Sequence, residues 1–113
     1  MKLMTKYFDY IKNGTKRIEL RLNDDKRKNI KIGDEIIFEE LNETPRYLKA
    51  KVTALYYEDN FEKLINKFDI KLLSSKNTKK EDLIITLNDI YSSEKQNQYG
   101  VVGIKIKLLE DRI

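Results

Sequence analysis

Residues 14–21, which read Gly-Thr-Lys-Arg-Ile-Glu-Leu-Arg, mark the point where a helical pattern gives way to a strand pattern. Before them, Met4, Tyr7, Phe8 and Ile11 follow the i, i+3, i+4, i+7 spacing of an amphipathic helix. Gly14, the first residue of this segment, can adopt the left-handed backbone conformation that ends many helices. The chain is therefore predicted to begin with a short helix that turns directly into a strand.

The strand predicted from residue 16 onward has an apolar face and a charged face. Alternation places two sets of side chains on opposite faces, the apolar Ile18, Leu20 and Leu22 and the charged Arg17, Glu19 and Arg21. Two interpretations of the charged face remain open. It is either a solvated ion-pair ladder, worth about 0–1 kcal/mol per pair, or the floor of a polar cavity. In a cavity, an arginine would bind phosphate in a bidentate manner, and the glutamate would accept a proton or a hydrogen bond from the amine of a nucleobase.

Lys16 also has two interpretations. It follows a predicted helix C-terminus, where a cation is favoured. At the mouth of a barrel, the same lysine would contact a phosphate, or act as a base if its pKa were lowered.

The remaining elements follow from periodicity and turn residues. In chain order they are strand 35–38, strand 47–57, helix 60–67, helix 78–91 and strand 99–108. The helices are predicted to start at an Asn60 cap and at a capping box from Thr78 to Glu81. Residues 92–98 are predicted to form a polar loop.

The two longest strands carry the details that bear on the fold. Leu48, Ala50, Val52 and Ala54 are expected to share one face of the first. The glycines of the last strand predict a bend or bulge there, as at the corner of a barrel. The fold class is therefore α+β, a small, partly open β-barrel with short flanking helices. With 113 residues, the chain suits one domain, residues 1–113.

Composition excludes several kinds of chemistry. The chain has no histidine and no cysteine, which removes Ser-His-Asp triads, Cys-His pairs, disulfides and histidine metal ligands. No carboxylate cluster has metal spacing, so no metal and no cofactor are predicted. Any acid or base would be a carboxylate, a lysine or a tyrosine. No run of 18 apolar residues and no signal segment are present, so a cytoplasmic location without membrane contact is expected.

Charge is unevenly distributed along the chain. Residues 1–31 hold ten basic and four acidic residues, a net charge of +6, whereas the remainder has 13 basic and 15 acidic residues, a net charge of −2. The basic first third of the chain favours a partner with phosphates. Solvated surface lysines without such a partner would give the same distribution of charge. The cluster Lys26-Arg27-Lys28 lies just beyond the charged strand. Tyr47, Tyr57 and Tyr99 sit at strand ends, where a ring either stacks on an unpaired base or packs at the core edge.

The spacing Gly14-x-Lys16-x-x-Glu19-x-Arg21 resembles the signature of the ASCH domain, a small β-barrel of the PUA-like group. Two flanking segments are also similar to that family and occur in the same order, residues 30–38 after the motif and residues 99–104 in the closing strand. The resemblance implies a PUA-like barrel with a cleft lined by the motif, and a role with RNA or a nucleotide.

One branch of that family hydrolyses the acetyl amide of 4-acetylcytidine. This chain resembles it at Lys16, the base of that branch, and at Arg21. It has Glu19 where the branch has a threonine nucleophile, and the branch's catalytic glutamate falls near Lys76, in a stretch without acids. Amide hydrolysis is therefore not expected. Another branch has been linked to RNA cleavage.

Three functional hypotheses follow. The first is a module that binds RNA or a modified nucleotide, using Gly14, Lys16, Arg17, Glu19, Arg21, Lys26, Arg27 and Tyr99. The alternative is a hydrolase acting on RNA or a nucleoside, a ribonuclease or an acetylcytidine amidohydrolase, with Lys16 and Glu19 as the catalytic acid and base. The third is a regulator that binds a small ligand.

Overall fold

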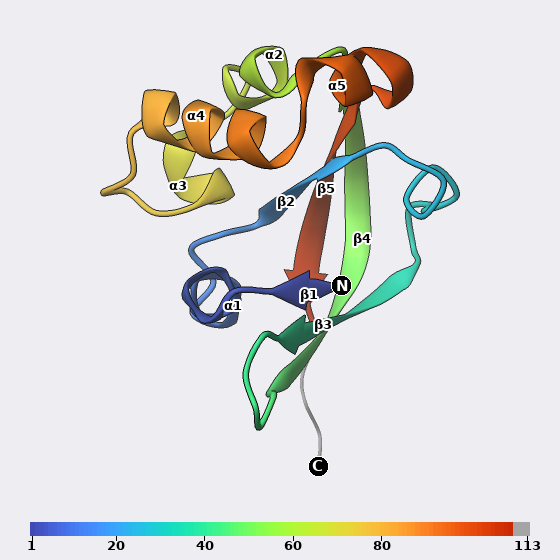
Figure 1. Cartoon of the computed structure of the whole chain (residues 1–113). Helices are drawn as coiled ribbons and strands as arrows, with labels where there is room; N and C mark the ends of the chain where they lie inside the picture. The colour runs from blue at the N-terminus through green and yellow to red at the C-terminus, as the bar shows by residue number, and fades with distance from the viewer. Residues whose placement is uncertain (110–113) are drawn as a thin grey trace.

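The fold is built on a five-stranded sheet that curls into a half-barrel (Figure 1). The computed structural model describes residues 1–109. The strands are β1 (Lys2–Leu3), β2 (Ile18–Leu22), β3 (Glu35–Glu40), β4 (Tyr47–Glu58) and β5 (Val101–Leu108). Their order across the sheet is β1-β3-β4-β5-β2, and all neighbours are antiparallel except β1 and β3. The two edges of the sheet are therefore both formed near the start of the chain.

Short helices cover the sheet on two sides. They are α1 (Thr5–Lys12), α2 (Phe61–Ile65), α3 (Ile70–Leu73), α4 (Lys80–Ile90) and α5 (Ser93–Tyr99). Helices α2–α5 gather over one end of the sheet, whereas α1 lies beside β1 (Figure 1). The prediction of an α+β, partly open barrel with short flanking helices is confirmed. No helix within residues 1–109 is both long enough and apolar enough to cross a membrane.

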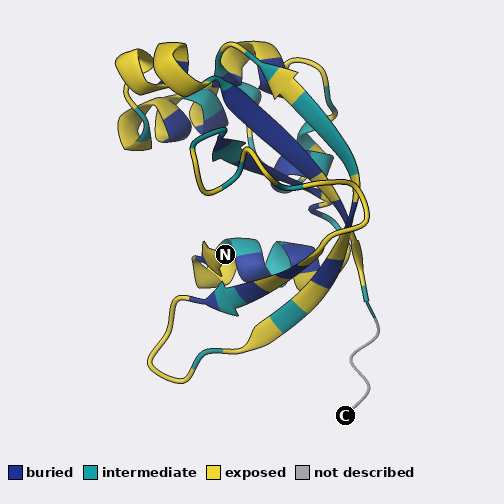
Figure 2. Cartoon of the chain, turned by 90° about the vertical axis from the view of Figure 1, so that its right-hand side faces the viewer, coloured by how far each residue is buried: buried dark blue, intermediate teal, exposed yellow. Residues whose placement is uncertain are grey.

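Alternation along β5 divides the apolar core into two layers. Val102, Ile104 and Ile106 pack on the inner face with α1 and β3, while Val101 packs on the outer face with α2, α3 and α4. Buried positions concentrate in the sheet and exposed ones on the outer sides of the helices (Figure 2). Ile18, Leu20 and Leu22 share one face of β2, as alternation predicted, and this face packs in the outer layer.

The bulge lies in β4, and not at the glycines of β5. The pairing register shifts between Val52 and Ala54, which leaves Thr53 as the extra residue. Because the shift exchanges the two faces, Leu55 packs against the inner layer in place of the predicted Ala54. Gly103 has a different purpose. A Cβ there would lie 3.3 Å from Cγ2 of Ile18 on β2 and 3.5 Å from Cδ1 of Leu64 on α2, so the glycine leaves room for both side chains over β5.

Helix starts and ends agree with the sequence in part. Gly14 has a φ of +85° after α1, and the Asn60 side chain caps α2, both as predicted. The predicted capping box is wrong, because α4 begins one residue later and the Thr78 hydroxyl bonds to the hydroxyls of Ser74 and Ser75 instead.

The predicted loop at 92–98 is also wrong. The Ser92 hydroxyl caps α5, and buried Gln96 fixes that helix to its neighbours. Gln96 accepts a hydrogen bond from the Phe61 amide and donates to the Asn88 side chain and the Tyr91 carbonyl. Helix α3 and the two-residue strand β1 were not predicted at all.

An ion-pair network fixes the β3–β4 connection to α1. Buried Glu40 accepts from Nε and Nη2 of Arg46 at 3.0 and 2.9 Å, and Nη2 also donates to Asp9 at 2.8 Å. The hydrogen bond from Arg46 lowers the pKa of Glu40 to about 2. This carboxylate is therefore held charged to low pH.

Candidate functional site

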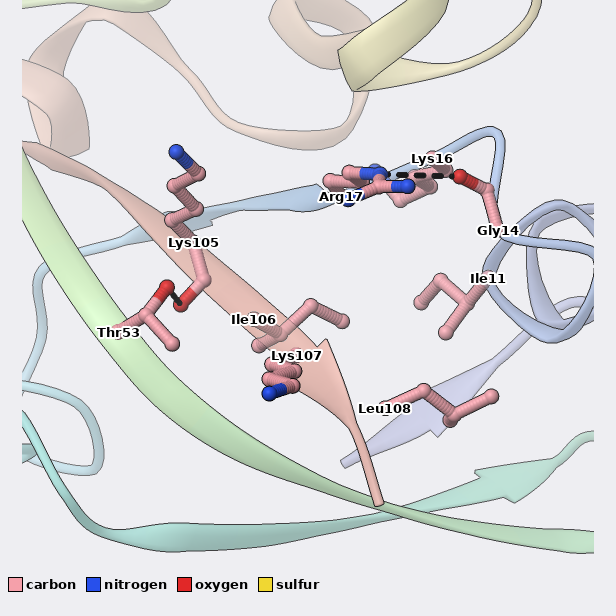
Figure 3. A pocket seen from close by; sticks show the side chains of 9 residues that line it. All are labelled: Ile11, Gly14, Lys16, Arg17, Thr53, Lys105, Ile106, Lys107 and Leu108. Atoms are coloured by element: carbon pink, nitrogen blue, oxygen red, sulfur yellow. Dashed lines mark hydrogen bonds between the residues drawn. The ribbon is translucent and has the colours of Figure 1, made fainter. Parts of the chain in front are cut away.

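The segment between α1 and β2 separates Arg17 from the rest of the charged motif. Alternation predicted that Arg17, Glu19 and Arg21 share a face, but β2 begins only at Ile18. Arg17 lies before the strand, its amide bonds to the carbonyl of Leu72, and its Nε donates to the Gly14 carbonyl at 3.2 Å. Arg17 and Gly14 therefore line a different hollow from Glu19 and Arg21 (Figure 3).

Lys16, and not Arg17, is the basic residue that lies beside Glu19 on its N-terminal side. Its side chain is 3% exposed, and Nζ donates to the carbonyls of Ile18 and Leu73 at 2.8 and 2.7 Å. A third contact, at 3.3 Å, reaches Oε1 of Glu19. Burial lowers the pKa of Lys16, and Glu19 opposes that shift. Three acceptors match the three protons of an ammonium group, so the geometry holds the charged lysine and ties β2 to α3.

Glu19 is buried between two cations. Oε1 accepts from Lys16 and from the amide of Leu20, and Oε2 accepts from Nε and Nη2 of Arg21 at 3.2 and 3.0 Å. Burial alone would raise the pKa of Glu19, but Lys16 and Arg21 together hold it below its ordinary value. The carboxylate is therefore an anion with all its acceptor positions in use.

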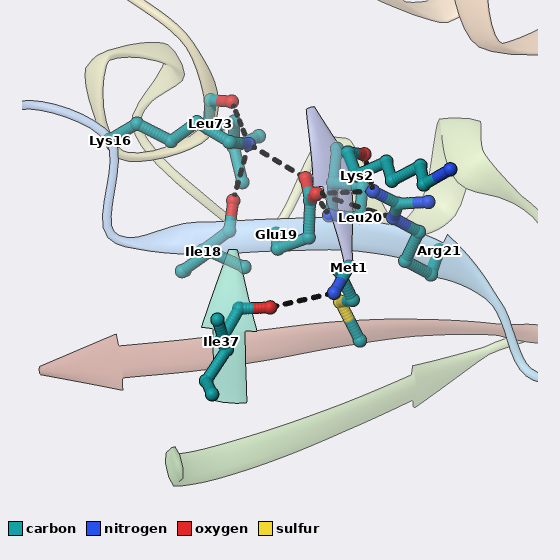
Figure 4. Close-up of polar contacts among 9 residues, drawn as sticks. All are labelled: Met1, Lys2, Lys16, Ile18, Glu19, Leu20, Arg21, Ile37 and Leu73. Carbon is teal, nitrogen blue, oxygen red and sulfur yellow. Dashed lines mark hydrogen bonds and ion pairs between the residues drawn. The ribbon is translucent and has the colours of Figure 1, made fainter. Parts of the chain in front are cut away.

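Arg21 joins the two edges of the half-barrel. Besides binding Glu19, its Nη2 donates to the backbone carbonyl of Lys2 at 2.8 Å, and so connects β2 with β1 (Figure 4). Within residues 1–109, no protein acceptor bonds to Nη1, and the side chain is 16% exposed. One edge of a rigidly held guanidinium is thus left for a ligand.

Lys16, Glu19 and Arg21 form the floor of a cleft of about 380 Å³ between the N-terminal segment and α3–α4. Most of its walls are apolar or aromatic side chains, Leu3, Met4, Tyr7, Leu20, Leu41, Leu73, Leu83, Leu87, Ile90 and Tyr91. At the rim, Met4, Leu41 and Ile90 are 59%, 53% and 63% exposed. Large apolar side chains exposed together around a concave site mark a binding surface.

The charge of the cleft is positive. Lys2, Lys6, Lys16 and Arg21 line it with a single acid, Glu19. Since Lys16 and Glu19 neutralise each other, the charge presented to a ligand comes from the two rim lysines and the free edge of Arg21. Such a site recognises an anionic group beside an apolar one.

Other residues that were predicted for the site lie outside this cleft. Lys26 and Arg27 are in the turn that follows β2, where Arg27 pairs with Asp24 at 3.4 Å and Lys28 pairs with Asp25 at 3.0 Å. Tyr99 ends α5 and is 37% exposed. The basic cluster is thus largely neutralised by its own neighbours.

The aromatic and apolar lining was missed by sequence reasoning. Tyr7 was predicted only as part of an amphipathic helix, and Leu87, Ile90 and Tyr91 only as part of helix 78–91, yet all four line the cleft and Ile90 is open to solvent. No local pattern distinguishes a side chain on the rim of a cleft from one in the core, because both occupy the same apolar stripe. Within residues 1–109, no group of three or more acidic side chains is placed to hold a metal ion.

Comparisons with known proteins agree with this fold. The crystal structure of hypothetical protein PH0355 superposes with a TM-score of 0.84 at 34% identity, covering 96% of both chains. The solution NMR structure of protein PF0455 from Pyrococcus furiosus gives a TM-score of 0.71 at 30% identity, over 98% of this chain and 100% of that one. No curated protein sequence matches. The family model of the ASCH domain matches residues 1–110. Sequence and fold thus agree over nearly the whole length, and the chain belongs to the ASCH domain family.

Proposed function

We propose that the cleft binds a nucleotide, either free or as an unpaired residue of single-stranded RNA. The observation that carries this proposal is the free guanidinium edge of Arg21 at the floor of an apolar cleft. A nucleotide has the matching halves, a flat base with polar edges and a charged phosphate. The cleft volume of about 380 Å³ lies within the range of small-molecule sites.

The apolar walls support recognition of an unstacked base. Tyr7 and Tyr91 line the cleft together with leucine and isoleucine side chains. Stacking on aromatic rings accepts any base, whereas hydrogen bonds to the base edge discriminate among bases. Nη1 of Arg21 is the donor that would read an acceptor on that edge or a phosphate oxygen.

Two rim lysines support a phosphate beside the base. Lys2 and Lys6 line the cleft and form no ion pair within residues 1–109. Their flexible ammonium groups act as point charges on a phosphate, while the arginine supplies direction.

The hydrolase alternative has weaker support. A general base needs a free lone pair and a pKa near the working pH, but Nζ of Lys16 donates to three acceptors. The pKa of Glu19 is lowered, and both its oxygens are already bonded. The pair is therefore better suited to holding Arg21 than to moving a proton.

The test is calorimetric titration with nucleoside monophosphates and with a short single-stranded RNA. Helix α4 offers a matched pair of variants, because Ile90 lines the cleft and Ile85 does not, although their exposures are similar, 63% and 59%. Ile90→Asp is expected to weaken binding at least tenfold, through one more negative charge and a lost apolar contact, while Ile85→Asp retains affinity. Equal affinities of the two variants would refute the cleft as the site.

A second assay separates binding from catalysis. The protein is incubated with 4-acetylcytidine and with labelled RNA, and the products are separated by chromatography. Unchanged substrates are expected. Turnover that Glu19→Gln abolishes would establish the hydrolase alternative instead.

A further inference from the structure

We propose that a second groove, at the edge of β5 beyond the end of β2, binds the phosphate backbone of single-stranded RNA through Arg17, Lys105 and Lys107. This groove of about 420 Å³ lies between the end of α1 and strands β4 and β5 (Figure 3). This proposal does not depend on the proposed function of the cleft, because the groove can bind phosphates even if the cleft binds no ligand.

Strand register places Lys105 and Lys107 on the face of the sheet opposite Glu19 and Arg21. Glu19 pairs with Ile104, and Ile18 pairs with Lys105, so Lys105 shares a face with Ile18 and not with Glu19. Along that outer face, α2 covers Gly103, against which Leu64 packs. The next two outward positions, Lys105 and Lys107, are exposed. The sequence changes from apolar to basic where the helical cover ends.

The charge of the groove is positive and unpaired. Three basic residues besides Lys16 line it, namely Arg17, Lys105 and Lys107, and no acidic side chain within residues 1–109 does. None of the three takes part in an ion pair in the same part of the chain. The predicted basic cluster at 26–28 differs, because two of its three cations are paired with nearby aspartates.

The sheet brings like charges together at this place. Lys107 lies directly opposite Lys51 on β4, and like charges at directly opposed positions destabilise a sheet. On its other side, Lys51 is opposite Glu35 of β3, so in this row of three residues the acidic side chain is separated from Lys107 by Lys51. An anion bound beside Lys107 would relieve the repulsion.

Local backbone geometry shapes the groove and fixes one of its cations. The extra residue in β4, Thr53, lines the groove, and its hydroxyl donates to the Lys105 carbonyl at 3.4 Å. A bulge increases the bend and twist of a strand, which makes the surface concave here. The Arg17 guanidinium is anchored through Nε to Gly14, while no bond within residues 1–109 engages its terminal nitrogens.

A single RNA strand fits these features better than a compact anion. Lys105 and Lys107 are two residues apart on one strand face, about 6–7 Å between their Cα atoms. This separation is comparable with that of successive phosphates along an extended strand. Within residues 1–109, no aromatic side chain lines the groove, so a base has no ring to stack on, and contacts of the cations to the backbone without sequence preference are expected.

The test measures the affinity of a fluorescently labelled twelve-nucleotide poly(U) strand at increasing salt. Lys105→Gln/Lys107→Gln is compared with Lys79→Gln/Lys80→Gln, which removes the same charge at the start of α4, outside both concave sites. Neither groove lysine side chain makes a hydrogen bond within residues 1–109, so the first variant is expected to fold normally. Far-ultraviolet circular dichroism and urea unfolding check this for both variants.

The groove variant is expected to bind RNA several-fold more weakly than the control variant. Its plot of log affinity against log salt should be less steep by about 1.4, since each phosphate contact on a single strand contributes about 0.7. Binding of mononucleotides in the cleft should be unchanged, whereas Ile90→Asp affects the mononucleotide. Equal RNA affinity and slope in the two double variants, or no RNA binding by the wild-type protein at low salt, would overturn the proposal. Equally tight binding of polyglutamate to the wild-type protein, lost in the groove variant, would overturn it in favour of an acidic protein partner.

Discussion

The floor of the cleft and the groove contain similar charged residues in opposite electrostatic states. In the cleft, Lys16 and Glu19 are buried and bonded to each other, and most of Arg21 is engaged by protein acceptors. In the groove, Lys105 and Lys107 are exposed and without an ion pair in the described part of the chain. The difference separates charges that build a site from charges that attract a ligand.

This difference determines what each region contributes to stability. A buried pair is costly to desolvate, and removal of one partner leaves the other charge unpaired in the interior. An exposed lysine is hydrated and screened, so its loss has little effect on folding. Substitutions in the two regions should therefore affect different observables.

The largest expected effect comes from Glu19→Ala. It leaves Lys16 buried without its counter-ion and deprives Arg21 of its support, at an expected cost of about 3–5 kcal/mol in the free energy of unfolding. Urea denaturation measures it, and Lys105→Ala is the matched control, expected to stay within about 0.5 kcal/mol of wild type. Similar urea midpoints for the two variants would abolish the distinction between the regions.

A double-mutant cycle sharpens the same point. Lys16→Met and Glu19→Gln should each destabilise the protein, and the double variant should be less destabilised than their sum by about 0.5–3 kcal/mol, because the partners are in contact. The cycle is measured by urea unfolding of the four proteins. Additive effects would mean that the two side chains do not interact as described.

Acid should act on the paired carboxylates and leave the groove unaffected. Arg46 lowers the pKa of Glu40 to about 2, and the pKa of Glu19 is lowered as well. A carboxyl whose pKa is lower in the folded state stabilises the fold above its unfolded pKa, near 4.5, and this contribution disappears as the pH falls toward 2.

Unfolding free energies measured between pH 5 and pH 2 should therefore fall with pH. The decline should be shallower in Glu40→Gln and unchanged in Lys105→Gln/Lys107→Gln. A decline as steep in Glu40→Gln as in wild type would exclude Glu40 as a source of acid sensitivity.

The smallest expected effect separates stability from binding in a single variant. Lys107→Glu places a negative charge directly opposite Lys51 on β4. The substitution should therefore stabilise the protein by about 0.2–1 kcal/mol. The same change should weaken RNA binding. The two measurements are urea unfolding and the poly(U) titration, and a variant that lost stability would contradict the repulsion described in the groove.

Local sequence patterns predicted the elements that have a clear period. The alternation of β2, the length of β4 and the cap of α2 all follow from neighbouring residues. Helix α5 was missed because Ser93–Tyr99 is polar and Gln96 is its buried residue. Arg17 was misplaced because alternation was continued one residue beyond the start of the strand.

The candidate sites depended on information that is not local. Glu19 and Arg21 were recognised from their spacing, but Glu19 has a second partner, Lys16, which reaches it from the preceding loop. The groove requires the register between β2, β4 and β5, which brings Arg17, Thr53 and Lys105 together. The cluster at 26–28 looked strongly basic because its pairing with Asp24 and Asp25 requires a particular turn.

The bond from Arg21 to the Lys2 carbonyl also has a dynamic consequence. It is the hydrogen bond that joins β1 to β2 within residues 1–109, so the seam of the half-barrel is closed by a side chain and not by a backbone ladder. A ladder separates only when several backbone bonds break, whereas this connection depends on one hydrogen bond from Nη2. An anion that takes Nη2 from the carbonyl would release the two edges, and the work of opening would then form part of the binding free energy. The affinity of the cleft for such an anion and the opening of the half-barrel would then be linked through Nη2 of Arg21.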